Sequence, residues 1–132
     1  MKFTHCTDIH YAAQRASFRK NRISERGLEL TQTMLRTLDP QTDFLVNGGD
    51  LIQFEKGLDP ALDTIWMSAV RDAFNKSGLP VHYNIGNYDG ERIGGLEAVG
   101  QLLGTPHTSY YFDHMDRNGT PHRVIMLNQE FQ

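Results

Sequence analysis

Four polar residues in three short segments could bind metal ions. Asp8 and His10 are two positions apart, and Asp50 and Asn87 each follow a glycine. In a loop, a carboxylate and an imidazole at this spacing can reach one cation. A second carboxylate can bridge two cations, and an amide oxygen can bind the second. Mixed oxygen and nitrogen ligands without a thiolate suit Mn²⁺, Fe²⁺ or Zn²⁺. These residues therefore predict a site for divalent cations.

The apolar pattern places each of these segments at the end of a predicted strand. Strand-like runs cover residues 3–6, 44–46 and 80–85. Between them, apolar residues at helical spacing predict helices over 24–38 and 59–78. Alternating strands and helices favour a largely parallel sheet with helices packed on it. Ligands gather beyond the carboxyl ends of such strands, so we expect the four polar residues to converge.

The sequence pattern of the C-terminal part of the chain predicts a short helix followed by a β-hairpin. The helix covers residues 96–103, and two strands over 109–113 and 122–127 are joined by a turn at 116–119. Residues 86–90 form a glycine-bounded turn in this interpretation, and His114 falls in a loop.

Composition indicates one compact globular chain. It has 132 residues, 39% of them hydrophobic, with 13 Lys and Arg against 16 Asp and Glu, so 13 − 16 gives a net charge of −3. A single cysteine, Cys6, and the lack of a long apolar stretch predict a cytoplasmic protein that makes no membrane contact. The slight acidity argues against general nucleic-acid binding, because such binding depends on cationic side chains that neutralise phosphates.

Three motifs, each after a predicted strand, carry a resemblance. Asp8-x-His10, Gly49-Asp50 and Gly86-Asn87-x-Asp89 resemble, in this order, the first three motifs of the calcineurin-like metallophosphoesterase superfamily. The resemblance covers nearly the whole chain and is nearest to the cyclic-nucleotide phosphodiesterase-like branch. It implies a single α/β domain over residues 1–132, the N-terminal half of the family's two-sheet sandwich flanked by helices.

The same resemblance implies a reaction and the roles of the site residues. Asp8 and His10 would bind the first of two divalent metal ions, Asp50 would bridge both, and Asn87 would bind the second. Such a pair of metals activates water for in-line attack on phosphorus. The expected activity is metal-dependent hydrolysis of phosphoesters, with phosphodiesters or nucleotides favoured as small-molecule substrates.

Two departures from the family pattern keep an alternative open. Tyr88 stands where the family has a histidine that assists the leaving group, followed by the acid Asp89, and we assign both residues to the catalytic positions. Tyrosine is the weaker proton donor at neutral pH. The family also supplies further histidines from a C-terminal half that ends in Gly-His-x-His, which this sequence does not contain. The alternative is a catalytically impaired scaffold, and the expected partners are that second half or another copy of the chain.

The remaining histidines and a basic run have simpler interpretations. His5, His82 and His122 lie within strand patterns, where packed or surface histidines are commoner than ligands. A run of basic residues follows the Asp8-His10 loop, and solvated surface is favoured over a patch that steers phosphates. Its members are Arg15, Arg19, Lys20, Arg22 and Arg26.

Overall fold

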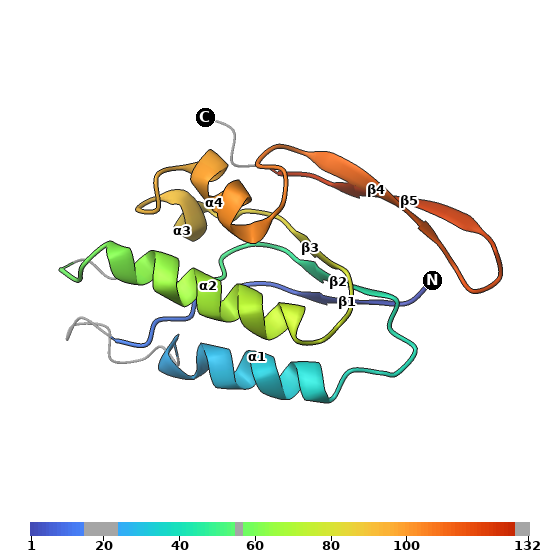
Figure 1. Ribbon diagram of the computed structural model, residues 1–132, viewed down its shortest axis with the longest axis horizontal. Helices are drawn as coiled ribbons and strands as arrows, with labels where there is room; N and C mark the ends of the chain where they lie inside the picture. Colours follow the sequence, from blue (N-terminus) through green and yellow to red (C-terminus); the bar gives the residue numbers. More distant parts are fainter. Residues whose placement is uncertain (15–23, 55–56, 129–132) are drawn as a thin grey trace.

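Two small β-sheets and the helices around them form the protein, seen here in a computed structural model that describes residues 1–14, 24–54 and 57–128 (Figure 1). The parallel sheet has the order β1-β2-β3, and β4 and β5 form an antiparallel hairpin. The strands are β1 (Phe3–Cys6), β2 (Phe44–Asn47), β3 (Val81–Tyr83), β4 (Tyr110–Met115) and β5 (Pro121–Met126). The helices are the 3-10 turn η1 (Ser24–Arg26), α1 (Gly27–Arg36), α2 (Ala61–Asn75), α3 (Asn87–Gly90) and α4 (Leu96–Leu103).

The helices α1 and α2 lie together on one side of the parallel sheet, and the hairpin lies on the other (Figure 1). On the helix side, Leu45 of β2 and Tyr83 of β3 belong to the main apolar core. The apolar stripe of α2 supplies most of the helical side chains of that core, namely Trp66, Met67, Val70 and Phe74. Full burial of a large apolar side chain stabilises a fold by about 1.5–3 kcal/mol, so this stripe holds α2 on the sheet.

A second, smaller core joins the hairpin to the opposite face of the sheet. Phe44 and Val46 of β2 pack with Met126 of β5. The Phe44 ring meets the Phe112 ring edge-on, with 5.2 Å between centroids, and the His82 ring stacks on Phe112 at 3.3 Å. Because side chains alternate along a strand, β2 contributes Leu45 to one core and its two neighbours to the other.

The predicted α/β fold is confirmed, and several local details differ. The strand predicted over 80–85 covers only Val81–Tyr83, and the helix predicted over 59–78 covers Ala61–Asn75. Residues 86–90, predicted as a turn, contain the single helical turn α3, which is too short to show a helical period in the sequence. The first helix ends at Arg36 rather than at residue 38. His114, predicted in a loop, lies in β4 and pairs with His122 of β5, which lengthens the hairpin.

The basic run that follows the first loop is described only at its end. Arg15, Arg19, Lys20 and Arg22 lie outside the described residues. Arg26 lies in η1, and its guanidinium donates to both carboxylate oxygens of Glu29 on the helix surface. Within the described segments, every helix is too short or too polar to cross a membrane.

The interface between the hairpin and the sheet should make the protein sensitive to acid. Burial lowers the pKa of His82 below its usual value, and the nearby His114 lowers it further. The unfolded chain therefore takes up a proton at His82 more readily than the folded chain does. As pH falls through about 6.5, the usual value for histidine, the free energy of unfolding should decrease.

The variant His82→Phe keeps an aromatic ring on Phe112 and removes the titrating group. Urea unfolding at about pH 7.5 and about pH 5 should show a smaller acid-induced loss of stability in this variant than in the original protein. His107→Phe changes an exposed histidine and serves as the control. An equal loss in all three proteins would contradict the assignment to His82.

Candidate metal centre

Three of the predicted ligands converge beyond the carboxyl ends of β1 and β2. Asp8, His10 and Asp50 each offer a ligand atom, and these atoms all lie within 4.8 Å of one another. The His10 Nε2 atom is 3.3 Å from Asp8 Oδ1 and 3.9 Å from Asp50 Oδ2. Asp8 is largely exposed, whereas Asp50 is mostly covered. One imidazole nitrogen and two carboxylate oxygens therefore face a common space.

The ligands are held on strained loop backbone. Asp8, His10 and Asp50 all have positive φ, at 58°, 49° and 55°. Such left-handed conformations are uncommon for residues other than glycine and are often found at functional sites. Backbone hydrogen bonds impose them, because Asp8 N–H donates to the Gly49 carbonyl at 3.1 Å and His10 N–H to the Asp50 carbonyl at 3.0 Å. The two ligand loops are thus fixed to each other.

Two glycines allow the loops after β2 and β3 to touch. Gly49 has φ of 101°, and a Cβ atom there would lie 2.6 Å from the Gly86 backbone nitrogen. A Cβ atom on Gly86 would collide with the Asp50 carboxylate. Any larger residue at either position would push Asp50 away from the segment that carries Asn87. These glycines are therefore needed for close approach of backbone to backbone.

The Asp89 carboxylate lies beneath this contact and joins the two loops. It is fully buried. Its Oδ2 atom accepts from the backbone N–H groups of Asp50 and Gly86, both at 2.9 Å, and Oδ1 accepts from Leu51 at 2.8 Å and Ile52 at 3.4 Å. Burial raises the pKa of Asp89 to about 7; the N–H groups of Gly86, Leu51 and Ile52 oppose this rise and the Asp50 charge adds to it. Asp89 thus connects the two loops through buried hydrogen bonds, and its predicted catalytic role stays a prediction.

Tyr88 contributes its backbone to the centre and turns its ring toward other aromatic rings. Its N–H group donates to Asp50 Oδ1 at 3.0 Å, which leaves Asp50 Oδ2 directed toward His10. The phenol ring meets the His10 ring edge-on, with 4.9 Å between centroids, and lies 5.2 Å from the Phe54 ring. The side chain expected to assist the leaving group thus packs beside a predicted metal ligand.

Asn87 lines a polar cleft of about 410 Å³ next to the cluster of Asp8, His10 and Asp50. Asp8 and Asp50 line the same cleft, and Leu127 and Asn128 approach it from the end of β5. The structure therefore brings all four predicted ligands to one edge of the sheet, with Asn87 exposed at the rim.

A profile of calcineurin-like phosphoesterases matches residues 1–130. The chain belongs to this family. No curated protein sequence matches it. The match confirms the superfamily predicted from the three motifs, while the nearer relation to the cyclic-nucleotide branch stays a prediction.

The chemistry of the donor set fits the divalent metals that calcineurin-like phosphoesterases use. Two carboxylates and an imidazole within 4.8 Å of one another would repel anions and attract a cation. The His10 Nδ1 atom is buried and has no hydrogen-bond partner among the described residues, so the Nε2 atom is the one presented to the cluster. Family membership and this cluster together support metal-dependent hydrolysis of phosphoesters.

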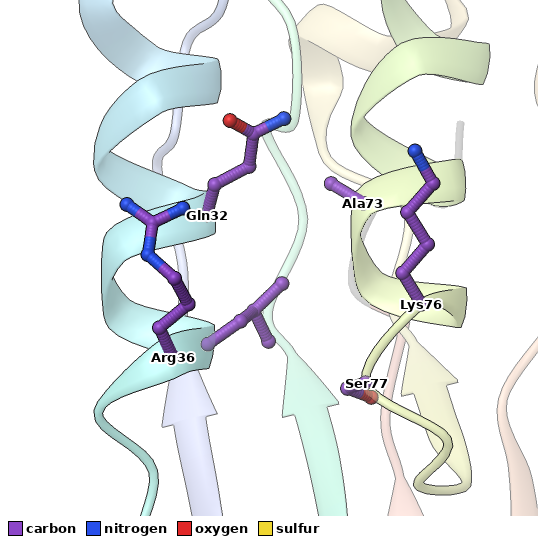
Figure 2. A pocket seen from close by; sticks show the side chains of 6 residues that line it. Gln32, Arg36, Ala73, Lys76 and Ser77 are labelled. Carbon is purple, nitrogen blue, oxygen red and sulfur yellow. The ribbon is translucent and has the colours of Figure 1, made fainter.

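A second hollow lies between α1 and α2 (Figure 2) and shares no lining residue with the polar cleft among the described residues. It measures about 380 Å³ and is lined by Leu35 and Ala73 with the cations Arg36 and Lys76. These cations lie at the C-terminal ends of their helices, where a positive charge stabilises the helix dipole. Among the described residues, its lining contains no carboxylate or imidazole that could bind the cations expected here.

Sequence reasoning missed four polar residues of the cleft as site residues, namely His5, Thr7, Asn84 and Asn128. His5 and Asn84 line it together with the predicted ligands. His5 precedes the Asp8 motif on β1, and Asn84 directly follows β3. Strand alternation was the one available signal, since it places both on the face opposite the helices, but it does not show that they reach the cleft.

The hydrogen bonds accepted by Asp89 predict that the isosteric change Asp89→Asn lowers both the free energy of unfolding and the affinity for Mn²⁺. Asp89→Asn has one acceptor oxygen where the carboxylate has two, and its NH₂ group would face buried N–H donors. Each buried N–H left without an acceptor costs about 1–3 kcal/mol, so the free energy of unfolding should fall by at least about 2 kcal/mol. Mn²⁺ affinity should also fall, on the order of tenfold, because both loops shift.

Urea unfolding and Mn²⁺ titration would measure these two effects. Asp72→Asn, which neutralises an exposed carboxylate bonded to Arg71, is the matched control. If Asp89→Asn unfolded at the same urea concentration as the control, Asp89 would not be the connection between the loops.

Proposed function

We propose that this calcineurin-like phosphoesterase hydrolyses phosphodiesters or nucleotides at a two-metal centre. The cluster of Asp8, His10 and Asp50 ligand atoms within 4.8 Å is the observation that carries the proposal. Asp8, His10 and Asp50 would hold the first cation, and Asp50 and Asn87 would offer ligands to a second at the rim of the cleft. Mn²⁺, Fe²⁺ and Zn²⁺ all suit these donors.

The bound cations would lower the pKa of water and neutralise charge on the phosphoryl oxygens. The protein's part is to fix the ligands before substrate arrives. The Tyr88 N–H group holds one oxygen of Asp50 and leaves the other free to face His10. The cleft then receives the phosphoester, water adds to phosphorus, the ester P–O bond breaks, and the leaving oxygen takes up a proton.

A scaffold function is the second candidate. Tyr88 occupies the place of the family's histidine, and its ring packs against His10 and Phe54. A chain that binds cations through Asp8, His10 and Asp50 without turning over substrate would serve as a binding protein. The experiments below separate these two candidates, because they measure cation binding and hydrolysis independently.

Removal of the bridging carboxylate should affect both binding and hydrolysis. In calorimetric titration with Mn²⁺, we expect about one tight site and a weaker one, because the first cation has three protein ligands in reach. Asp50→Ala should weaken both sites and abolish hydrolysis of a nitrophenyl phosphodiester. Asp113→Ala, which removes an exposed carboxylate of β4, should behave like the original protein. Unchanged binding in Asp50→Ala would refute the assignment.

The role of Tyr88 can be tested by restoring the family's residue. If leaving-group protonation limits turnover, Tyr88→His should accelerate hydrolysis of an unactivated phosphodiester about tenfold or more, since a positioned general acid contributes typically 10²–10⁴-fold. A nitrophenyl ester needs no such help and should change far less. Equal gains on both substrates would reject the leaving-group role. Cation binding without hydrolysis in either protein would favour the scaffold.

A further inference from the structure

Two aromatic rings next to the metal ligands belong to neither apolar core of the protein. The Phe54 and Tyr88 rings lie 5.2 Å apart between centroids and are tilted by 33° to each other. Both side chains are half-buried. Among the described residues, neither ring packs in the core on the helix face or in the core beneath the hairpin. Large aromatic side chains usually stabilise a fold by packing in its core, so this pair is available for another role.

Backbone hydrogen bonds hold the aromatic pair beside the ligand cluster. Phe54 follows Asp50 on the loop after β2. The chain between these two residues runs beside Tyr11, whose carbonyl accepts from the Gln53 N–H group at 3.0 Å. Tyr88 is fixed by its own N–H group, which donates to Asp50 Oδ1 at 3.0 Å. Both rings therefore lie on the loops that carry predicted metal ligands.

The imidazole of the cluster contacts this aromatic pair. The His10 ring lies edge-on to the Tyr88 ring, with 4.9 Å between centroids. The two carboxylates of the cluster, Asp8 and Asp50, instead line the polar cleft, and the described residues that line the cleft do not include His10 or either aromatic ring. The cluster therefore borders the cleft through its carboxylates and the aromatic pair through its imidazole. A phosphoester held at the cluster can extend a substituent along the rings.

We propose that Phe54 and Tyr88 form a stacking site that selects phosphoesters with a planar aromatic substituent, either a nucleobase or an aryl group. The inference rests on the proposed phosphoesterase function and deepens it, because it names a class of substrate. Every flat π system can stack on an aromatic side chain, and a stacked base typically gains about tenfold or more in affinity. The tyrosine at position 88, where the family has histidine, enlarges the ring surface that Phe54 offers.

A simpler role for the same rings is to support the His10 imidazole, which Tyr88 contacts. Loss of such support would weaken the binding of every phosphoester to a similar extent, because all of them depend on the same ligand cluster. Loss of a stacking surface would weaken only the binding of ligands that carry an aromatic ring. A comparison of flat and non-flat ligands on one protein therefore separates these two roles.

Phosphonates are suitable probes, because their P–C bond is not an ester bond and binding is measured without turnover. The first matched pair is phenylphosphonate and cyclohexylphosphonate, which are similar in size and differ in planarity. The second pair consists of the carbon-linked phosphonate analogues of AMP and of ribose 5-phosphate, which differ only in the base. Methylphosphonate has no ring and reports on the ligand cluster alone. The two pairs distinguish an aryl group from a nucleobase as the aromatic substituent.

The measurement is calorimetric titration of the full chain with each phosphonate, with and without saturating Mn²⁺. In the original protein, the AMP analogue should bind about tenfold more tightly than the ribose analogue, and phenylphosphonate about fivefold more tightly than cyclohexylphosphonate. A preference within only one pair supports the stacking site and identifies its aromatic group.

The variants separate the ring from the other properties of these side chains. Phe54→Leu keeps an apolar side chain at a position outside both cores, so it should fold, lose most of each preference and bind methylphosphonate as before. Tyr88→Phe keeps the ring without its hydroxyl group and should retain both preferences. Tyr111→Leu removes an exposed ring of β4 and is the matched control.

The outcomes distinguish the stacking site from the function on which it rests. Equal affinities within both pairs, unchanged preferences in Phe54→Leu, or a loss in Phe54→Leu that is equal for methylphosphonate would each overturn the stacking site. Binding of methylphosphonate that depends on Mn²⁺ would leave the proposed function standing in these cases. Absence of Mn²⁺-dependent binding for every phosphonate would refute the proposed function and the stacking site with it. Urea unfolding of each variant checks that a loss of binding does not reflect a loss of the fold.

Discussion

The candidate metal centre depends on the hydrogen bonds that the buried carboxylate of Asp89 accepts from two loops. The carboxylate accepts four backbone N–H groups, three from the segment after β2 and one from the segment after β3. Without an acceptor these donors would be buried and unsatisfied, so the carboxylate stabilises both loops in one arrangement. Burial raises the pKa of Asp89, and the hydrogen bonds from Gly86, Leu51 and Ile52 oppose that rise because they stabilise the charged form. The residue fixes the loops that carry Asp50 and Asn87 relative to each other.

Preorganisation of the ligands follows from this connection. Positive φ at Asp8, His10 and Asp50 is unfavourable locally and persists because hydrogen bonds between the loops impose it. Gly49 and Gly86 let the backbones approach more closely than any side chain would permit. A centre with this support would need little rearrangement to bind a cation, because its carboxylates are already held together against their mutual repulsion.

The two faces of the parallel sheet contribute differently to the cleft. The helix face carries the larger apolar core, in which side chains of the strands pack against those of the helices. The opposite face carries the smaller core around Phe44, Val46 and Met126, which seats the hairpin, and the segment after β5 brings Leu127 and Asn128 to the cleft. Polar residues on this same face, such as His5 and Asn84, consequently border the cleft wherever the hairpin does not cover the sheet.

The sequence by itself determined the order of strands and helices, the parallel sheet and the edge at which Asp8, His10, Asp50 and Asn87 meet. Apolar periodicity and strand-end motifs are local signals, and the carboxyl ends of parallel strands share one edge. Only the tertiary structure decided that Asp89 is buried, that the Tyr88 ring packs on His10, and that His5 and Asn84 line the cleft. Those outcomes depend on the distance between loops far apart in sequence, which no local pattern encodes.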